Sequence, residues 1–465
     1  MYILTQVLET SLLNLTKKHL NALVQTYFDS LTLAPNNHHY CDLVKTAEVQ
    51  FKSLHQDTLR AILESMDTSY RNSPERLKIA VVKDTRERTL WTRFGPLTYK
   101  RTIYQRKCDK HCFCYLDEYL GLPKYIKFDP MIRSMVLEAA SQSNSLIKVG
   151  KAIGQQCFET FGQTQASPIS RQSIRNILNH SEVNIPPIPA AHTPSTLFVM
   201  ADEKFIGRQG TKGKKQMIKL AVAFETRDLS NPKRPTLTGK HHFASSSNHF
   251  WEDFYDSLSA KYDMEKVQTI HLLGDGATWI KSGLSILQSR KDQIVDFSLD
   301  HFHYKQALRR FTRDDILLST MDGWFRTHLS HQIKTQLIAL QNETLTSSQT
   351  RSLTYLINHI SDIKRMLQNP HIACSMEAKI SHELASIFTS VPKGYSSSML
   401  NKLIQLRLAH RNGHSLQSLY FQSFHPNPSS TQFDYSIFDL RKYKGSALAD
   451  PQMAAYFAAN VFTHF

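Results

Sequence analysis

The order of apolar and amphipathic segments between residues 196 and 300 constrains the fold of this chain most strongly. Their patterns predict strands over 196–202, 214–226, 237–243, 269–275 and 294–300, and helices over 249–262 and 279–287. Three consecutive strands come first, and helices then alternate with the remaining strands. This order indicates an α/β fold built on a mixed sheet with helices on both faces.

Two of these apolar strands end in an acid, at Asp202 and at Asp275. Open α/β sheets place their sites at strand ends, so both carboxylates are candidates for one site. Gly274 and Gly276 flank Asp275 and would let backbone or a ligand approach closely. One such Asp alone is more simply a helix cap or a turn residue, whereas two of them in one sheet favour a site for a hard cation such as Mg²⁺.

The charge balance predicts a polyanionic partner. The chain has 465 residues, 41% of them hydrophobic, which suits two to four globular domains. Its formal net charge is +16. Residues 76–110 hold eleven Lys/Arg against three Asp/Glu, and residues 204–219 hold six against none. Local patches of this kind favour DNA or RNA over a generally basic surface without a ligand. No window approaches ~18 uninterrupted apolar residues, so no membrane span is expected.

The N-terminal region, residues 1–75, shows helical spacing of apolar residues over 8–31 and 43–66. Two such helices can pack as a hairpin or mediate dimerisation. A basic β-hairpin region, residues 76–125, follows, with strands on either side of a tight turn at Gly95 and Pro96. Its candidate DNA-backbone contacts are Arg93, Lys100, Arg101 and Arg106. A solvated basic edge strand would show the same residues.

Residues 126–184 are predicted to be helical. Ser170 is a good N-cap for a short helix over 171–180 that follows a helix over 145–161. This pattern is typical of a helix-turn-helix reader, with Arg171, Gln172 and Arg175 as candidate DNA contacts, although ordinary helix pairs share it. A Pro-rich stretch over 185–195 then predicts a semi-rigid linker and a domain boundary.

Six cysteines in a chain of this length indicate reduced thiols and a cytoplasmic setting. Four candidate zinc ligands lie close together, namely Cys108, His111, Cys112 and Cys114. A second pair at zinc-finger spacing is missing and the ligands are crowded, so a zinc site is the less favoured interpretation.

Several motifs together carry a family resemblance. They are ADEKF (201–205), GDGATWIKSG (274–283), LDHFHYKQAL (299–308) and CSMEAKISHELAS (374–386). With them the chain resembles bacterial insertion-sequence transposases of the ISLre type, which are related to Mutator-like transposases. The resemblance implies a ribonuclease H-like catalytic core over 196–303 and 373–413, a helical insertion over 304–372, and a C-terminal tail over 414–465.

The resemblance also implies a DDE triad of Asp202, Asp275 and Glu377 that holds two Mg²⁺ or Mn²⁺ ions, with Glu383 as the competitor for the third acid. Asp300 and His303 match an Asp-x-x-His signature, which suggests a place beside the metals or a DNA contact; alternatively, Asp300 caps the following helix. Glu203 stands where relatives usually have Gly, and strand alternation predicts that its side chain points to the opposite face. Further candidate phosphate contacts are Lys212, Lys214 and Lys215.

The expected activity is metal-dependent DNA cleavage and strand transfer at the ends of an insertion sequence. Its partners would be terminal inverted repeats and target DNA, bound by a homodimer or larger assembly at the nucleoid in the cytoplasm. Two alternatives share many of these features. One is a ribonuclease H-like nuclease without strand transfer, and the other is a DNA-binding protein derived from a transposase.

Overall fold

The computed structural model describes residues 2–32, 39–143, 145–158, 169–210, 215–228, 230, 236–341, 344–369 and 394–423. The chain divides into two compact units. The first comprises Met1–Ile132, Gly154–Ala166 and Phe424–Phe465, and the second comprises Arg133–Ile153 and Ser167–Ser423. Within the described residues, no helix has the length and apolar character needed to cross a membrane.

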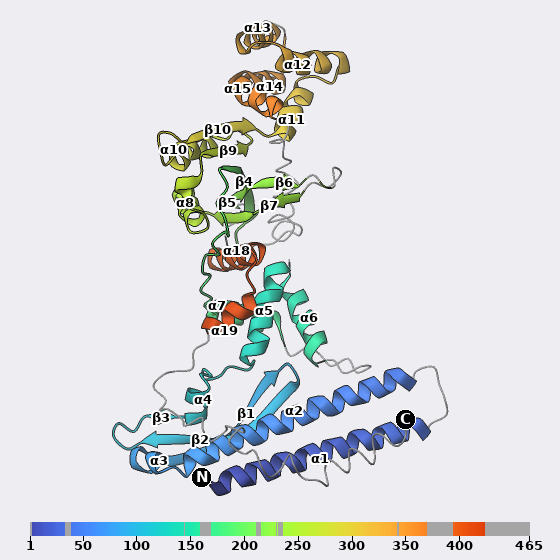
Figure 1. The fold of residues 1–465 in the computed structure, drawn as a ribbon, viewed down its shortest axis with the longest axis vertical. Coiled ribbons are helices and arrows are strands. Elements are labelled where there is room, and N and C mark those ends of the chain that lie inside the picture. Colours follow the sequence, from blue (N-terminus) through green and yellow to red (C-terminus); the bar gives the residue numbers. More distant parts are fainter. Residues whose placement is uncertain are drawn as a thin grey trace. The chain divides into compact units, whose positions relative to one another are not determined.

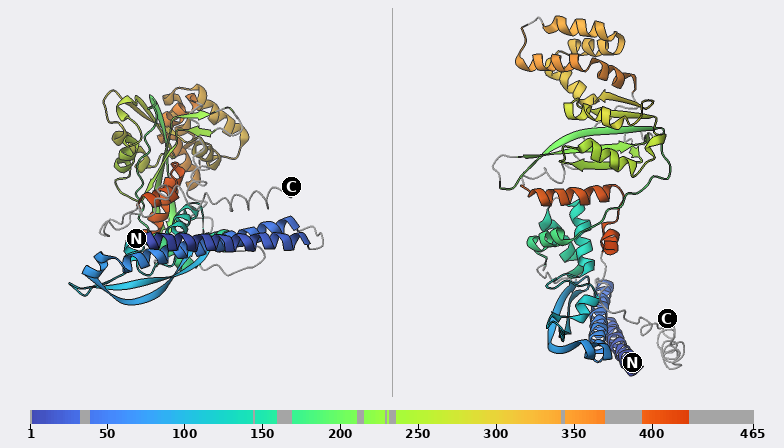
Figure 2. Two further views of the ribbon diagram at one scale, coloured as in Figure 1. Left: turned by 60° about the horizontal axis from the view of Figure 1, so that its bottom comes forward. Right: turned by 90° about the vertical axis from the view of Figure 1, so that its left-hand side faces the viewer.

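In the first unit, two long helices lie side by side, α1 (Tyr2–Thr32) and α2 (His39–Arg71), as both views in Figure 2 show. They form a helical hairpin, one of the two arrangements that the sequence left open. The short helices α3 (Pro74–Ile79) and α4 (Tyr115–Tyr119) lie before and after the basic strands.

The basic β-hairpin is confirmed, with β1 (Ala80–Thr92) antiparallel to β2 (Gly95–Arg106) and the short β3 (Cys112–Phe113) beyond β2. Its apolar face packs on α2 in a core that includes Leu63, Met66, Leu97 and Tyr99. Helix α2 also binds the backbone of β2, because Glu64 accepts a hydrogen bond from the N–H of Lys100 at 2.8 Å. Strand β2 is therefore partly covered by α2.

Three helices come next in the chain, α5 (Pro130–Gln142), α6 (Leu146–Phe158) and α7 (Arg171–His180). The second unit takes in α5 from Arg133, α6 as far as Ile153, and all of α7. The cap of α7 is as predicted, since Ser170 Oγ accepts a hydrogen bond from the N–H of Ser173 at 3.1 Å. The Pro-rich stretch over 185–195 has no helix or strand and lies within the second unit. Contacts across it hold that unit together, such as Lys402 Nζ donating to the carbonyl of Ser181 at 2.6 Å.

A mixed five-stranded sheet forms the centre of the second unit and confirms the α/β class (Figure 1). Its strands are β4 (Thr196–Gly207), β5 (Lys215–Phe224), β8 (His241–Ser245), β9 (Thr269–Gly274) and β10 (Ile294–Leu299). Their order is β10-β9-β4-β5-β8. Strand β5 pairs antiparallel with both β4 and β8. Strand β9 pairs parallel with both β4 and β10.

The prediction for the third strand was wrong. The segment 237–243 is divided by Gly239, whose φ of +60° makes a turn. Residues before this turn form β7 (Thr236–Thr238), which pairs with β6 (Thr226–Asp228) in a separate two-stranded ribbon. Residues after it form β8, the edge strand of the main sheet.

Helices α8 (Phe250–Ser259), α9 (Thr278–Lys281) and α10 (Gly283–Leu287), with the 3-10 turn η1 (Met264–Lys266), connect the strands. Five helices follow β10 and lie together beyond it in Figure 1: α11 (His301–Phe311), α12 (Asp315–Thr327), α13 (Ser330–Gln341), α14 (Ser347–Asn358) and α15 (Ile360–Gln368). Their buried residues share one continuous core with the sheet. Helices α18 (Ser397–Arg411) and α19 (Leu416–Ser423) end the described chain.

Candidate functional site

Asp202 does not end its strand, contrary to the sequence prediction. Strand β4 continues to Gly207, because the antiparallel partner β5 pairs with it along its whole second half. The parallel pairing with β9, however, stops at Met200. Asp202 therefore lies just past the point where the parallel part of the sheet ends, which is the edge where α/β sheets place their sites.

Asp275 lies at the same edge, directly after β9. Its Oδ1 accepts a hydrogen bond from the N–H of Ala277 at 2.9 Å, which fixes the carboxylate in a tight turn. Burial, with a smaller contribution from the nearby negative charge of Asp275, raises the pKa of Asp202 to about 6. Two carboxylates that are close together and partly shielded from water make a site that a cation would stabilise.

Asp300 and His303 complete this cluster from the start of α11. Asp300 is 2% exposed and accepts a hydrogen bond from the N–H of Phe302 at 3.2 Å, so it caps the helix. Its other oxygen lies 3.3 Å from Nδ1 of His303. This hydrogen bond raises the pKa of His303, to which the charges of Asp275 and Asp202 also contribute. Asp300 therefore both caps α11 and binds a histidine that lies close to the acid pair.

Glu203 is not part of the acid pair. Its carboxylate accepts a hydrogen bond from the indole N–H of Trp279, and Trp279 stacks on Trp251 of α8 with ring centroids 5.9 Å apart. Glu203 is therefore held by the aromatic cluster of α8 and α9. The sequence did not predict this hydrogen bond between Trp279 and Glu203, because the two residues are 76 positions apart.

The two glycines beside Asp275 are required by close packing. Gly276 has a φ of +87°, and a Cβ there would overlap the imidazole of His359. A Cβ at Gly274 would come within 2.8 Å of the side chain of Ile280 and 3.1 Å of the carbonyl of Ala201. The sequence indicated a close approach at these glycines, and the structure identifies what approaches.

A cavity of about 490 Å³ opens beside Asp275. It is lined by Asp275, His303, Gln306, Ala307, Arg310, Ser348, Arg351, Ser352 and Tyr355. The hydroxyl of Tyr355 donates a hydrogen bond to the backbone carbonyl of Asp275 at 2.6 Å. Sequence reasoning missed Tyr355, Arg310 and Arg351, because they belong to helices whose position relative to the sheet no local pattern reveals.

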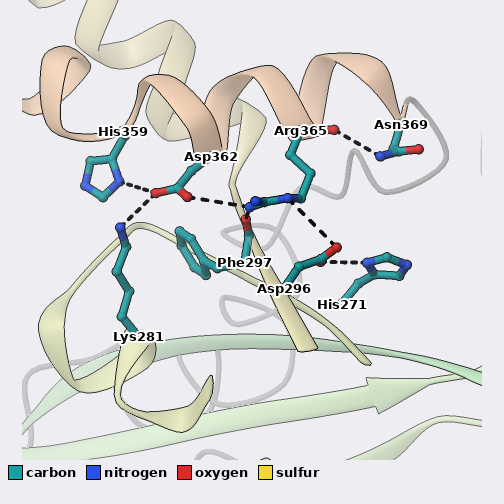
Figure 3. A network of polar contacts seen from close by, with 8 residues as sticks. All are labelled: His271, Lys281, Asp296, Phe297, His359, Asp362, Arg365 and Asn369. Carbon is teal, nitrogen blue, oxygen red and sulfur yellow. Dashed lines mark hydrogen bonds and ion pairs between the residues drawn. The ribbon is translucent and has the colours of Figure 1, made fainter. Parts of the chain in front are cut away.

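A polar network fastens α15 to the sheet next to this cavity (Figure 3). Asp362 accepts hydrogen bonds from Lys281 Nζ at 2.7 Å and from His359 Nδ1 at 2.8 Å. Arg365 donates to the carbonyl of Phe297, and its Nε lies 3.9 Å from Asp296. These contacts hold α15 against β10 and α9.

Several predicted site residues lie outside the described residues, namely Glu377, its competitor Glu383, Lys212 and Lys214. Among the residues that the structure does describe, no group of three or more His, Cys, Asp or Glu side chains is arranged to hold a metal ion. This applies also to the segment with Cys108, where the thiol of Cys112 instead lies 3.2 Å from Lys83 Nζ.

The predicted DNA contacts of the first unit differ in their environments. Arg93, Lys100 and Arg106 are exposed. Arg101 is instead engaged by the buried carboxylate of Asp117, which also binds Arg88 at 2.7 Å. The guanidinium of Arg101 therefore serves an internal ion pair, whereas Arg93 and Lys100 are exposed. Arg106 is exposed too, and its guanidinium lies 4.0 Å from the carboxylate of Asp109.

On α7 of the second unit, Arg171 and Gln172 are exposed and Arg175 is half-buried. Arg171 and Arg175 line a cavity of about 330 Å³ with the apolar side chains of Leu146, Met399 and Leu403 among its walls. Lys215, at the start of β5, is exposed. These predicted contacts belong to the second unit, whereas the predicted contacts on the hairpin belong to the first.

Known proteins that are similar to this chain match it over most of its length. The family model described as "Uncharacterised protein family (UPF0236)" matches residues 33–422. A UPF0236 protein of Caldanaerobacter subterraneus subsp. tengcongensis is 24% identical over 431 residues, which cover 90% of this chain and 86% of that protein. A second UPF0236 protein of the same organism is 24% identical over 430 residues, with the same coverage of both chains. The name of the first protein contains eleven locus designations, and the name of the second contains four. No solved structure matches the chain significantly. The family match spans most of the sequence, including Asp202 and Asp275, and the chain belongs to the UPF0236 family.

Proposed function

We propose that this protein is a DNA transposase, which cuts DNA at the ends of an insertion sequence and joins the freed 3′ ends to target DNA. The observation that carries the proposal is the acid pair of Asp202 and Asp275 at one edge of the sheet. The charge of each carboxylate acts on His303, and Asp275 acts on Asp202. Such an electrostatically coupled cluster beside an open cavity is typical of a functional site.

The sheet topology supports a ribonuclease H-like core. Three antiparallel strands are followed by two parallel strands reached through helices, in the order β10-β9-β4-β5-β8. This is the strand order expected of a ribonuclease H-like sheet. Helices α11 to α15 occupy the chain position where the resemblance to Mutator-like transposases implies an insertion.

The described residues fit the chemistry of a divalent cation. Carboxylate oxygens are the ligands that Mg²⁺ and Mn²⁺ prefer, and burial already raises the pKa of Asp202 to about 6. We propose that Asp202, Asp275 and Glu377 hold two such ions. When bound, two ions activate an attacking oxygen and stabilise the leaving oxygen of the phosphodiester.

The remaining residues of the cluster position the acids and the DNA. Asp300 holds the imidazole of His303 through a hydrogen bond that raises the pKa of His303, so this side chain carries a positive charge more readily. A positive group beside the acid pair would attract a backbone phosphate. Tyr355 holds the turn at Asp275 through its hydrogen bond to the backbone carbonyl.

The relatives support a mobile element. The printed name of one relative joins eleven locus designations of one genome. Repeated copies in one genome are what transposition produces. On this proposal the protein binds terminal inverted repeats and target DNA at the nucleoid in the cytoplasm. It works as a homodimer or larger assembly, because two ends must be joined.

The test uses purified protein, Mg²⁺, and a DNA fragment that carries the sequences flanking its own gene, together with a target plasmid. We expect cleavage at fixed positions with 3′-hydroxyl ends, followed by joined products. Asp202→Asn and Asp275→Asn should each lower the cleavage rate by at least about 10³-fold, because metal coordination is lost. DNA binding, measured by anisotropy, should remain.

Glu203→Gln is the matched control, because Glu203 is the neighbouring carboxylate and is held by Trp279. It should cleave like the unchanged protein. Cleavage without joined products would instead make the protein a nuclease. DNA binding without any cleavage would make it a DNA-binding protein derived from a transposase.

A further inference from the structure

Two helices of the group that follows β10 line the cavity beside Asp275. One wall comes from α11, with His303, Gln306 and Arg310, and the other comes from α14, with Ser348 and Arg351 among its residues. Asp275 and Tyr355 lie at the end nearest the sheet, where the Tyr355 hydroxyl binds the Asp275 carbonyl. The cavity therefore continues the acid site outward along the two helices.

The charge of this cavity suits an anion. Arg310 and Arg351 are exposed, one on each helix, and Asp275 is the only carboxylate among the lining residues in the part of the chain that the structure describes. Guanidinium groups bind phosphate oxygens with paired N–H donors and stay charged at all relevant pH values.

The walls are fixed relative to each other by polar contacts at the base of α14. Thr346 and Gln349 form a reciprocal capping box at the start of this helix. The amide of Gln349 also donates to the carbonyl of Phe311, at the end of α11, at 3.0 Å. Arg351 Nε donates to the carbonyl of Ser347 at 3.1 Å, which holds the stem of this side chain along its own helix. The spacing of the walls is thereby set before any ligand binds.

The size of the cavity selects the kind of nucleic acid. A volume of about 490 Å³ lies in the ~300–1,000 Å³ range of small-molecule sites. Such a space admits a nucleotide of a single strand, whereas a duplex, whose major groove alone is ~12 Å wide, is too broad to enter. Polar lining by Gln306, Ser348 and Ser352 suits a sugar-phosphate rather than a stacked row of bases.

We propose that this cavity binds the sugar-phosphate of one nucleotide next to the scissile phosphodiester, with Arg310 and Arg351 contacting its phosphate from opposite sides. The inference rests on the proposed function, since it takes Asp202 and Asp275 as the place of cleavage. It adds that the helical insertion positions the single strand that leads into that site. Arg310 and Arg351 are positioning residues, not groups that take part in the chemical step.

The test measures binding rather than cleavage. An Asp202→Asn background prevents reaction, and the probe is an element-end DNA whose cut strand extends as a single strand past the scissile position. Arg310→Ala and Arg351→Ala should each weaken binding about tenfold, because each removes a charge-assisted contact to phosphate. Arg309→Ala is the matched control: Arg309 is exposed on the same helix but does not line the cavity, and its change should leave binding unaltered.

A methylphosphonate scan locates the contact. One neutral linkage at a time replaces a phosphate along the cut strand. The linkage adjacent to the scissile one should weaken binding to the protein with both arginines about tenfold, and have no further effect on the Arg310→Ala, Arg351→Ala double variant. The proposal would be overturned if the neutral linkage and the double variant each weakened binding independently. It would also be overturned if both single arginine variants bound the probe as the background does, with thermal unfolding that matches the background.

The two proposals fail in different ways. Loss of the proposed function would show as absent cleavage by the unchanged protein, with the arginine-dependent binding intact. If this inference is wrong, Mg²⁺-dependent cleavage will be normal, and the methylphosphonate will weaken binding equally with and without Arg310 and Arg351.

Discussion

Gly276 shows how single residues shape the acid site. Its φ of +87° turns the chain after Asp275, and the space that a side chain would fill is taken by His359. His359 in turn donates to Asp362, so the turn at Asp275, the imidazole and α15 are packed in series. A glycine is needed here both for the backbone conformation and for the close approach.

Gly276→Ala should lower the free energy of unfolding by about 2–4 kcal/mol, because a left-handed backbone and an overlap with His359 are both imposed. Chemical denaturation measures the change. Gly323→Ala is the control: Gly323 lies within α12 with nothing inside 4 Å of its would-be Cβ, so alanine should stabilise that helix by about 0.5–1 kcal/mol. Equal stability of Gly276→Ala and the unchanged protein would contradict the described packing.

At this scale, the sequence was informative where one residue type follows a clear pattern. Asp202 and Asp275 were found because each follows an apolar run, and the structure brings them together. Tyr355 and His359 were not found. Tyr355 reaches Asp275 across 80 residues, and nothing in the helical pattern of α14 distinguishes it from an ordinary amphipathic aromatic.

Among the elements, α15 is held against the sheet by polar contacts with β10 and α9. Burial alone would raise the pKa of Asp362, but hydrogen bonds from His359 and Lys281 hold the pKa below its usual value. The ionised carboxylate is thus favoured in the folded chain. Its stabilising effect is complete above about pH 4 and is lost as the pH falls through the lowered folded-state pKa.

Asp362→Asn should lower the free energy of unfolding at pH 7 by about 1–3 kcal/mol, because Lys281 and His359 lose a charged acceptor. The difference from the unchanged protein should shrink as the pH falls below about 4. Denaturation curves at several pH values measure it. Asp292→Asn changes a side chain that is 78% exposed and should have little effect. A pH-independent loss would indicate that the charge of Asp362 plays no part.

Elements were predicted well where both ends carry local signals. Helix α7 begins after Ser170 and ends at His180 as expected, because the cap is a local hydrogen bond. Strand β4 was ended too early at Asp202. An acid after an apolar run resembles a strand end, whereas the continuation to Gly207 depends on pairing with β5, which the run itself does not encode.

At the scale of the whole molecule, the basic character divides into internal and exposed parts. Arg101 has a side chain only 18% exposed and binds Asp117, whose carboxylate is 7% exposed and also binds Arg88. Lys100 and Arg106 are exposed on the same hairpin. The eleven Lys/Arg of residues 76–110 therefore overstate the positive side chains that a nucleic acid can meet on this hairpin. Charge counts along the sequence cannot make this distinction, because Asp117 is distant from Arg88 and Arg101 in the chain.

Lys100→Ala and Arg106→Ala should each reduce the salt dependence of DNA binding, with the slope of log Kobs against log[salt] falling in magnitude by about 1 per phosphate contact. Fluorescence anisotropy between low and high salt measures the slopes. Arg101→Ala should leave the slope unchanged and lower the thermal stability, because it removes one partner of a buried carboxylate. A full loss of slope in Arg101→Ala, without destabilisation, would contradict this division.

We propose that Asp202 and Asp275 jointly hold a catalytic divalent cation. Replacing a carboxylate by a thiol tests it, because Mg²⁺ binds thiolates poorly whereas Mn²⁺ accepts softer ligands more readily. Cleavage of element-end DNA is measured for Asp202→Cys in each metal, beside Asp202→Asn. We expect Asp202→Cys to be inactive with Mg²⁺ and to regain cleavage with Mn²⁺, while Asp202→Asn stays inactive in both. Full activity of Asp202→Cys with Mg²⁺, or no recovery with Mn²⁺ in a variant that folds and binds DNA normally, would contradict it.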